Sequence, residues 1–222
     1  MSKVSALVSA YYAEDYIQQR LINLYGCKKT DLEIVVVCQE GTPEHELVRD
    51  YNLNLVLTPD IPPIGKAWNL AIEASTGDYL TTANTDDRYL IGGLRQMVDT
   101  LDEHPEIGLV FAQVDINDGF NQYPWQRINN DTGEVVNILE VLKRRCIIGP
   151  MPLWRKSIHE QVGLFNELYT VASDYDMWLR MAKQDVRFWY IAESMGVYMR
   201  RPDSLEHRNP TACREETAQV QA

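Results

Sequence analysis

Two adjacent carboxylates at the end of a short apolar run have the clearest chemical potential in this chain. Asp86 and Asp87 follow the run Tyr79 to Ala83, whose composition predicts a short buried strand. Open α/β sheets bind ligands at the carboxyl ends of their strands. Neighbouring carboxylates repel each other unless a cation or hydrogen-bond donors lie between them, and Mg²⁺ and Mn²⁺ prefer such oxygen ligands. We therefore predict a divalent metal site here; the alternative is an Asx turn that ends the strand and caps the next helix.

A second pair of acids stands at the start of a predicted amphipathic helix, Ser173 to Lys183. Asp174 and Asp176 both fall in its first turn. The structural interpretation is a capping box, in which Ser173 is the N-cap and Asp176 lies at N3. The functional interpretation is that Asp174 is held by its backbone on the rim of a cleft, as a general base must be to reach a hydroxyl. The two interpretations are compatible.

Polar residues also follow the first two predicted strands. Ser9 and Tyr11 offer a hydroxyl and an aromatic face on which a nucleobase could lie, although packed tyrosines in a turn are the alternative. Gln39 and Glu40 could hydrogen-bond a base edge or a ribose, or form a plain turn. Lys66 begins a helix whose amino end attracts anions, although a lysine at such a position is usually only solvated.

Three features of the second half are candidates for contact with a ligand. The segment from Asp118 to Thr132 is polar and aromatic, and it predicts a long loop or a loose hairpin. Trp154 is a candidate because exposed tryptophan faces suit sugar rings. His207 is a lone histidine near the end of the chain, and it is either a ligand or a surface residue.

Alternating strand and helix patterns in the first half predict a parallel, doubly wound α/β sheet that positions these groups. We expect helices with a capping glycine at Gly77 and with Thr42 as an N-cap. The predicted strands are Val4 to Ser9, Glu33 to Cys38, Leu53 to Thr58, Tyr79 to Ala83 and Ile107 to Gln113. The predicted helices are Glu14 to Leu24, Pro43 to about Tyr51, Gly65 to Ser75 and Leu90 to Leu101.

The second half has shorter elements and a polar end. Beside the helix from Ser173 we expect helices at Ile138 to Arg145 and Lys156 to Val162, and strands at Pro152 to Arg155, Arg187 to Ala192 and Met195 to Met199. The polar residues after Arg208 are expected to fray.

Composition limits the class of partner. At 222 residues the chain suits one large domain, and its 45% hydrophobic and 24% charged content is that of a globular protein. A net charge of −11 and a pI near 4.8 repel phosphate backbones and anionic lipids, so we exclude nucleic acid as a partner. A phosphate-bearing substrate would need a metal ion or a few placed cations.

The cysteines and the apolar runs indicate in which cellular compartment we expect the protein. Four cysteines show neither CxxC pairing nor zinc spacing, so we expect them to be reduced, with Cys38 in the core, in a cytoplasmic protein. Val4 to Ala13 resembles the apolar part of a secretory signal, but a first strand explains it better. No apolar run reaches the ~18 residues that span a bilayer.

Two motifs, in this order, carry a family resemblance. Gly77-Asp78-Tyr79-Leu80 runs into Asn84-Thr85-Asp86-Asp87, and Gly163-Leu164-Phe165-Asn166-Glu167 precedes Ala172-Ser173-Asp174-Tyr175-Asp176-Met177-Trp178-Leu179-Arg180. Together they resemble the family 2 inverting glycosyltransferases with a GT-A fold, from Lys3 to about Asn209. The resemblance implies a single GT-A domain at 1–209, with a nucleotide-sugar-binding half at about 1–115, an acceptor-binding half at 116–209 and a polar tail at 210–222.

The resemblance also implies roles for single residues. Asp174 falls on the catalytic base of the family, and Asp86 and Asp87 fall on the motif that holds a divalent metal and the donor diphosphate. The positions expected to contact the nucleotide sugar are Ser9, Tyr11, Gln39, Glu40, Lys66, Asn69, Asn84 and Asp86. For such an enzyme, our candidates on the acceptor side are the segment from Asp118 to Thr132, Trp154, Asp176 and His207.

The sequence departs from the pattern of the family at three places. Gln39-Glu40-Gly41-Thr42 replaces the usual Asp-Asp-Gly-Ser, which affects the choice of base. Asn84 replaces the first acid of the metal motif, and Trp68 stands where an arginine is common.

The family resemblance, together with the acids Asp86, Asp87 and Asp174, implies a metal-dependent inverting transfer of a sugar. The donor would be a UDP-, GDP- or dTDP-sugar, and the sugar would pass to an acceptor hydroxyl. A sugar nucleotidyltransferase would also use carboxylates and a metal, but it normally has a glycine-rich basic loop near the first strand, and Ser9 to Ala13 has none. The other alternative is a non-catalytic nucleotide- or carbohydrate-binding protein in which Asp174 only caps its helix.

Overall fold

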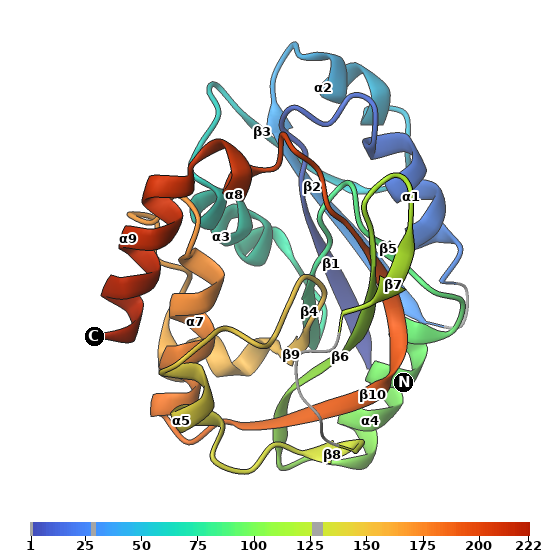
Figure 1. The fold of residues 1–222 in the computed structure, drawn as a ribbon. Coiled ribbons are helices and arrows are strands. Elements are labelled where there is room, and N and C mark those ends of the chain that lie inside the picture. Colours follow the sequence, from blue (N-terminus) through green and yellow to red (C-terminus); the bar gives the residue numbers. More distant parts are fainter. Residues whose placement is uncertain (1, 28–29, 126–130) are drawn as a thin grey trace.

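The computed structural model describes residues 2–27, 30–125 and 131–222. Part of the predicted acceptor segment, at 126–130, lies outside these residues. Within them, ten strands form one sheet with helices on both faces (Figure 1), which confirms the predicted α/β class. The strands are β1 Lys3–Ser9, β2 Asp31–Gln39, β3 Asn54–Thr58, β4 Tyr79–Thr82, β5 Arg88–Tyr89, β6 Ile107–Asn117, β7 Gln122–Pro124, β8 Gly133–Glu134, β9 Leu153–Arg155 and β10 Arg187–Met199.

The first seven helices follow the predicted order with shifts at their ends, and the last two were not predicted. They are α1 Ile17–Tyr25, α2 Pro43–Val48, α3 Ile64–Ala74, α4 Gly93–Glu103, α5 Ile138–Leu142, α6 His159–Val162, α7 Ser173–Lys183, α8 Leu205–Arg208 and α9 Pro210–Gln221, with a 3₁₀ turn at Lys156–Ile158 before α6. Thr42 caps α2 as predicted, because its side chain accepts from the backbone N–H of His45. The helix ends at Val48 rather than near Tyr51.

The four strands β3, β2, β1 and β4 pair in parallel. The strand order of the sheet is β3-β2-β1-β4-β9-β6-β10-β5, and β1 pairs in parallel with both β2 and β4. The short strand β9 is antiparallel to both β4 and β6, whereas β6 and β10 are parallel to each other. The two strands predicted at 187–192 and 195–199 are one strand, β10, whose register shifts near Ser194. The sheet is thus mostly parallel and doubly wound, as expected.

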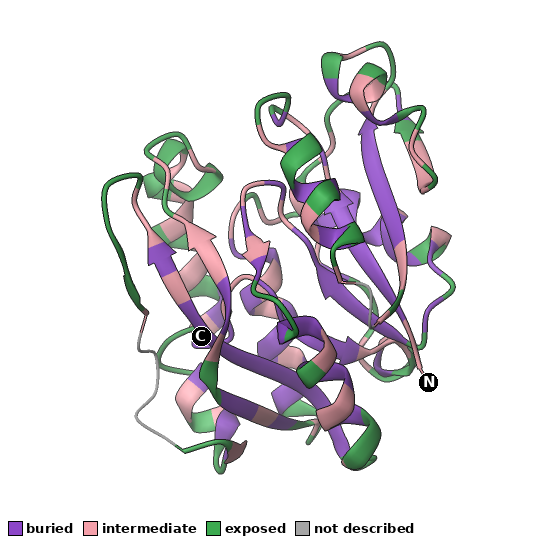
Figure 2. Ribbon diagram, turned by 90° about the vertical axis from the view of Figure 1, so that its right-hand side faces the viewer, coloured by how far each residue is buried: buried purple, intermediate pink, exposed green. Residues whose placement is uncertain are grey.

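Two layers of apolar side chains cover the sheet, because successive strand residues point to opposite faces. Leu7, Val35 and Val37 pack against α3, α5 and α7 on one face. Val8 and Val36 pack against α1, α2 and α4 on the other. Figure 2 shows the central strands buried between these helices.

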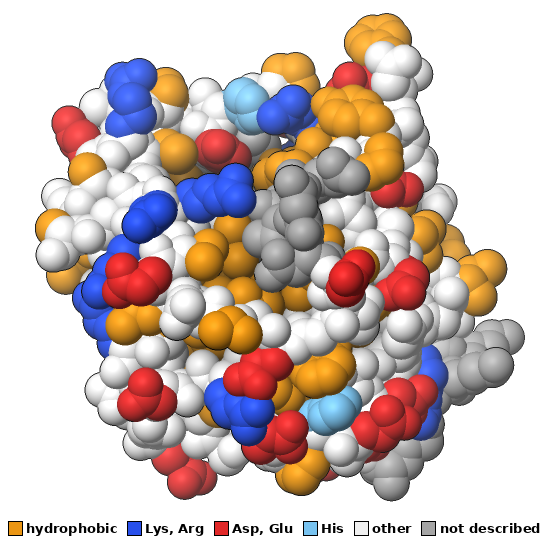
Figure 3. Space-filling view, turned by 60° about the horizontal axis from the view of Figure 1, so that its bottom comes forward, with side chains coloured by type: hydrophobic (Ala, Val, Ile, Leu, Met, Phe, Trp, Pro, Cys, Tyr) orange, Lys and Arg blue, Asp and Glu red, His pale blue; other side chains and the backbone are white. Residues whose placement is uncertain are grey.

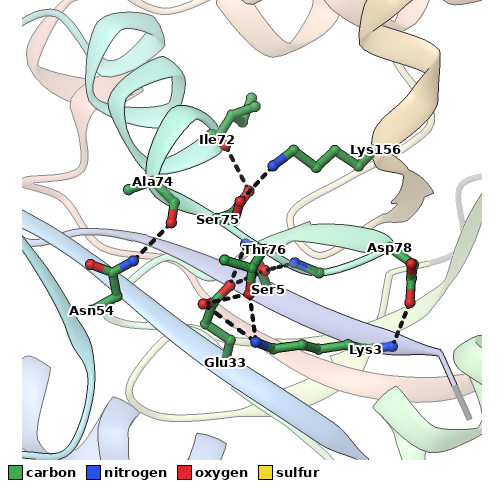
Figure 4. Close-up of polar contacts among 11 residues, drawn as sticks. Lys3, Ser5, Glu33, Asn54, Ile72, Ala74, Ser75, Thr76, Asp78 and Lys156 are labelled. Atoms are coloured by element: carbon green, nitrogen blue, oxygen red, sulfur yellow. Dashed lines mark hydrogen bonds and ion pairs between the residues drawn. The ribbon is translucent and has the colours of Figure 1, made fainter.

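The amino edge of the sheet is held together by one carboxylate. Glu33 Oε2 accepts from Ser5 Oγ at 2.5 Å and from the Thr76 amide at 2.8 Å, and Lys3 Nζ lies 3.5 Å from Glu33 Oε1 (Figure 4). The chain comes so close to β1 here that a Cβ on Gly77 would lie 2.7 Å from Ser5 Oγ. Gly77 is therefore a packing glycine; its predicted role as a helix cap is wrong, because Ser75 caps α3.

The polar end of the chain is helical rather than frayed, so that prediction is wrong. Helix α9 lies beside α7 (Figure 1), and Val220 is buried against it. A polar helix can dock in this way when a few specific contacts replace a wide apolar stripe. Those contacts come from Glu216 and Gln221 and are described below.

The remaining expectations concern cysteines, charge and membranes. The cysteines are unpaired and Cys38 is buried, as predicted. On the face shown in Figure 3, basic side chains have acidic ones beside them. In the part of the chain that the structure describes, every helix is too short or too polar to cross a bilayer.

Candidate functional site

The carboxyl ends of β1, β2 and β4 meet at one edge of the sheet. Ser9 is paired with Val37, and Leu7 with Thr82. Beyond the ladders, the Ala10 amide donates to the Val37 carbonyl at 2.9 Å and the Ala83 amide donates to the Leu7 carbonyl at 2.9 Å. The polar residues that follow each strand therefore leave the sheet at the same place, as the sequence predicts.

The residues expected to contact a nucleotide line this edge. Tyr11 is half-buried, its hydroxyl lies 2.9 Å from Thr58 Oγ1, and burial raises its pKa. Gln39 Nε2 donates to the Pro59 carbonyl at 3.1 Å, which turns its amide towards β3. Ser9 is half-buried and Glu40 is exposed.

Asp87 is a buried acid. It is fully inaccessible, and its carboxylate accepts from Asn84 Nδ2 and from the Met199 amide, both at 3.2 Å. Burial and the neighbouring Asp86 raise the pKa of Asp87 to about 7, against the opposing effect of the Arg20 guanidinium. These acids do not cap the next helix, as one interpretation held, because β5 follows them and Gly92 is the N-cap of α4.

Asp86 faces a cation from the far end of the chain. Arg201 Nε lies 3.0 Å from Asp86 Oδ2, and the Arg201 guanidinium stacks over the Tyr16 ring at 4.2 Å. Sequence reasoning missed Arg201. The available signal was a pair of arginines, Arg200 and Arg201, directly after a predicted strand.

The same segment carries His207 to this edge of the sheet. Its neighbour Arg208 lies 5.5 Å from the centre of the Tyr12 ring, in the turn after β1. His207 is exposed, and its Nδ1 is 2.7 Å from Ser204 Oγ.

A buried arginine that sequence reasoning also missed contacts the interior side of the acidic turn, which we define as residues Asn84 to Asp87. Arg20 Nη1 donates to the Asp87 carbonyl at 2.9 Å and to Asn23 Oδ1 at 3.0 Å. Asn23 Nδ2 donates in turn to the Tyr89 carbonyl at 2.9 Å. Arg20 lies on the buried stripe of α1 beside Ile17, and this position was the signal. Its contacts fix the backbone that follows Asp86.

The predicted base, Asp174, lies in the first turn of α7. Its Oδ1 accepts from the Tyr175 amide at 2.7 Å, and its side chain is half-buried. The predicted capping box is wrong, because Ala172 is the N-cap and Ser173 Oγ donates to the Asn166 carbonyl at 2.9 Å. Asp176, expected on the acceptor side, is paired with Arg180 at 2.8 Å.

The start of α3 abuts the start of α7. A Cβ on Gly65 would lie 2.4 Å from Ser173 Oγ and 2.8 Å from the Asn166 carbonyl oxygen. Since α3 begins after the carboxyl end of β3, this contact brings Asp174 to the same edge of the sheet as the acidic turn. Lys66, next to Gly65, is exposed in the first turn of α3.

Asn69 fastens the segment that leads into α7. Its Nδ2 donates to the Phe165 carbonyl at 2.9 Å and to Glu167 Oε1 at 3.0 Å, and its Oδ1 accepts from the Phe165 amide at 2.9 Å. Asn69 is buried. Its position in the structure is therefore that of a link between α3 and the 165–167 segment.

Trp154 has no exposed face, so that expectation is wrong. It is fully buried in β9, where Nε1 donates to His159 Nε2 at 3.0 Å and the ring meets Trp178 edge-on at 5.3 Å. In the segment from Asp118 to Thr132, Phe120 is 95% exposed, so an aromatic side chain does lie at the surface there.

The acidic turn has few ligands for a metal. Among residues 2–27, 30–125 and 131–222, no three His, Cys, Asp or Glu side chains gather to hold an ion. Asp86 is the accessible acid, and its ion pair with Arg201 shows that this carboxylate attracts positive charge. Mg²⁺ in nucleotide sites is commonly held by one or two carboxylates, with phosphates and waters as its other ligands. The oxygen ligands present therefore fit an ion of this kind that is held by Asp86, with the buried Asp87 next to it.

Comparison with known proteins identifies the family of this chain. The model of the family described as glycosyl transferase family 2 matches residues 5–163. The chain belongs to glycosyl transferase family 2. This confirms the resemblance drawn from the sequence motifs.

Two relatives of this family 2 chain are informative. It is 25% identical over 188 residues to the amylovoran biosynthesis glycosyltransferase AmsE of Erwinia amylovora, covering 80% of this chain and 68% of AmsE. Its fold is similar to S. aureus TarS 1–349 in complex with UDP-GlcNAc, with a TM-score of 0.75 and 22% identity, over 91% of this chain and 60% of that one. A UDP complex of TarS matches with a TM-score of 0.73 and 20% identity, over 99% of this chain and 64% of that one. The chain thus spans less than two thirds of these TarS structures.

Proposed function

We propose that this family 2 protein is a metal-dependent inverting glycosyltransferase, which transfers one sugar from a nucleotide diphosphate sugar to an acceptor hydroxyl. The observation that supports the proposal is the close approach of Gly65 to Ser173, because it joins the start of the helix that carries Asp174 to the start of α3, which follows the carboxyl end of β3. An inverting transfer needs a base on one side of the reacting carbon and charge stabilisation on the other.

In this mechanism Asp174 accepts the proton of the acceptor hydroxyl as that oxygen attacks the anomeric carbon. The bond from the anomeric carbon to the diphosphate oxygen breaks in the same displacement, so the configuration inverts and no covalent sugar intermediate forms. The Tyr175 amide bonds Asp174 Oδ1 and limits the rotation of the carboxylate. A divalent ion held at Asp86 would neutralise charge on the departing diphosphate.

The donor side consists of groups at three strand ends. Tyr11 offers a ring face and Lys66 a positive charge, while Gln39 and Glu40 stand where a base edge or ribose would be read. TarS is similar in fold and was crystallised with UDP-GlcNAc, so UDP-sugars are the first donors to test. By similarity to AmsE, the acceptor would be a saccharide in polysaccharide or glycoconjugate assembly.

A product assay tests the proposal. The protein is incubated with a mixture of UDP-, GDP- and dTDP-sugars and a saccharide panel, with Mn²⁺ or with EDTA, and the released phosphate species are identified. Release of nucleoside diphosphate that EDTA abolishes supports the proposal. In a parallel reaction with added pyrophosphate, formation of nucleoside triphosphate and sugar 1-phosphate would indicate a nucleotidyltransferase. Thermal stabilisation by a sugar nucleotide with no turnover in either reaction would indicate a binding protein.

A further inference from the structure

The C-terminal helix α9 is hydrogen-bonded to the backbone directly before α7, the helix that carries the proposed base. Glu216 Oε1 accepts from the Thr170 amide at 2.8 Å, and Oε2 accepts from the Val171 and Ala172 amides at 2.8 and 2.9 Å. Three successive backbone N–H groups thus converge on one carboxylate. These bonds join α9 to the residues directly before α7, and Figure 1 shows the two helices side by side.

The negative charge of the Glu216 carboxylate strengthens its hydrogen bonds to these amides. Partial burial alone would raise the pKa of Glu216, but its three amide partners lower it below the usual range, so the side chain is ionised at neutral pH. A carboxylate at the amino end of a helix also interacts favourably with the helix dipole. Charge-assisted hydrogen bonds of this type are roughly twice as strong as neutral ones.

The same helix contacts α7 on the other side of Asp174. Gln221 Nε2 donates to Tyr175 Oη at 3.1 Å and to the Arg144 carbonyl at 2.8 Å, and the Tyr175 hydroxyl donates to the Leu142 carbonyl. Asp174 therefore lies between two points held by α9. Its carboxylate is two residues beyond the last amide bound by Glu216.

We propose that Glu216 is a positioning residue for the transfer reaction: it holds the 170–172 backbone so that Asp174 is presented to the acceptor hydroxyl. This inference rests on the proposed function. Glu216 acts through Asp174 and has no direct role in binding the donor. A displacement of about 1 Å at a reacting group can lower turnover on the order of 10²-fold, so loss of Glu216 should lower kcat by about 10- to 100-fold.

The first experiment needs no substrate. Hydrogen exchange of the intact protein is measured for wild type, for Glu216→Ala and for Glu215→Ala, a control at the exposed neighbouring position on α9. We expect amides 170–172 to exchange at least about 10-fold faster in Glu216→Ala alone. Unchanged protection would overturn the inference.

The second experiment separates positioning from general stability. Nucleoside diphosphate release from the UDP-, GDP- and dTDP-sugar mixture is measured at a temperature where thermal scans show each variant folded. We expect lower kcat with unchanged donor affinity in Glu216→Ala, and partial recovery in Glu216→Gln, which keeps one acceptor oxygen. In an Asp174→Asn background, Glu216→Ala should cause little further loss, because both changes act on one step.

The outcomes distinguish the two proposals. If Asp174→Asn abolishes turnover while Glu216→Ala turns over at the wild-type rate, only the positioning role is overturned. If wild type releases no nucleoside diphosphate, the proposed function fails and the positioning role fails with it. A loss in Glu216→Ala that is equally large in the Asp174→Asn background would also contradict positioning, because it would show action through another group.

Discussion

Gly65 and Ser173 are in such close contact that a Cβ on Gly65 would lie 2.4 Å from Ser173 Oγ. Gly65 lies in the first turn of the helix that carries Lys66, and Ser173 is the first residue of the helix that carries Asp174. The distance between the proposed donor side and the proposed base therefore depends on a residue without a side chain.

Gly65→Ala tests this relationship. In an open helical position, Gly to Ala stabilises by up to about 1 kcal/mol. Here the added methyl group must push α3 away from α7, so we expect a loss of about 1–3 kcal/mol in the free energy of unfolding and a fall in activity. Denaturant unfolding measures the first effect. Glu73→Ala, at an exposed position of α3, is the control, and stabilisation by Gly65→Ala would contradict the account.

Arg201→Gln tests whether Asp86 is the carboxylate that receives the metal ion. The Arg201 guanidinium occupies Asp86 Oδ2, so it competes with any cation for that oxygen. We expect Arg201→Gln to tighten Mn²⁺ binding to the donor-free protein by a few-fold up to about 10-fold, consistent with the ~1.4 kcal/mol that a tenfold change represents. Titration calorimetry measures the affinity.

The matched control for that measurement is Arg200→Gln, the exposed arginine one position earlier. It removes the same charge without removing the ion pair. If the two variants changed the Mn²⁺ affinity equally, the affinity would depend on the overall charge and not on the contact with Asp86.

His159 predicts a pH dependence of stability. Its Nε2 accepts from buried Trp154 Nε1, so the folded protein requires the neutral ring with the proton on Nδ1, which donates to the Gly163 carbonyl at 2.8 Å. Burial lowers the pKa of His159, although the Gly163 contact opposes this effect. Below about pH 6.5 the unfolded chain binds a proton that the folded protein does not bind.

The stability contributed by this histidine is therefore complete above about pH 6.5 and is lost as the pH falls through the interval down to its folded pKa. Unfolding free energies measured between pH 5 and pH 7.5 should show this slope in wild type and a smaller slope in His159→Gln. His104→Gln, outside the Trp154 contact, is the control. An equal slope in wild type and His159→Gln would contradict the assignment.

Local patterns predicted the elements well where apolar periodicity and turn residues agreed. The β-branched runs of β1 and β2, and the Thr42-Pro43 start of α2, are examples. Trp154 was misplaced at the surface because a strand of three residues has no periodicity from which burial could be inferred. Helix α9 was missed because its composition is polar and its docking depends on contacts with distant parts of the chain.

In the candidate site, too, residues with a local sequence pattern were predicted and residues that depend on distant contacts were missed. The acids Asp86, Asp87 and Asp174 stand out from their neighbours, because each follows or begins a recognisable element. Arg201 and Glu216 do not, since their importance comes from partners far away in the sequence, which only a folded chain brings close. For Arg201 the only local signal was the arginine pair after a predicted strand, and that pair does not identify Asp86 as its partner.

The central claim is that Asp174 takes the proton of the acceptor hydroxyl, and turnover of Asp174→Asn tests it most directly. Its control is Asp185→Asn, an exposed position with positive φ that asparagine tolerates. General-base catalysis contributes about 10²- to 10⁴-fold, so nucleoside diphosphate release by Asp174→Asn should fall by that factor while donor affinity and the Asp185→Asn rate stay at wild-type values. Release by Asp174→Asn at the wild-type rate would contradict the account.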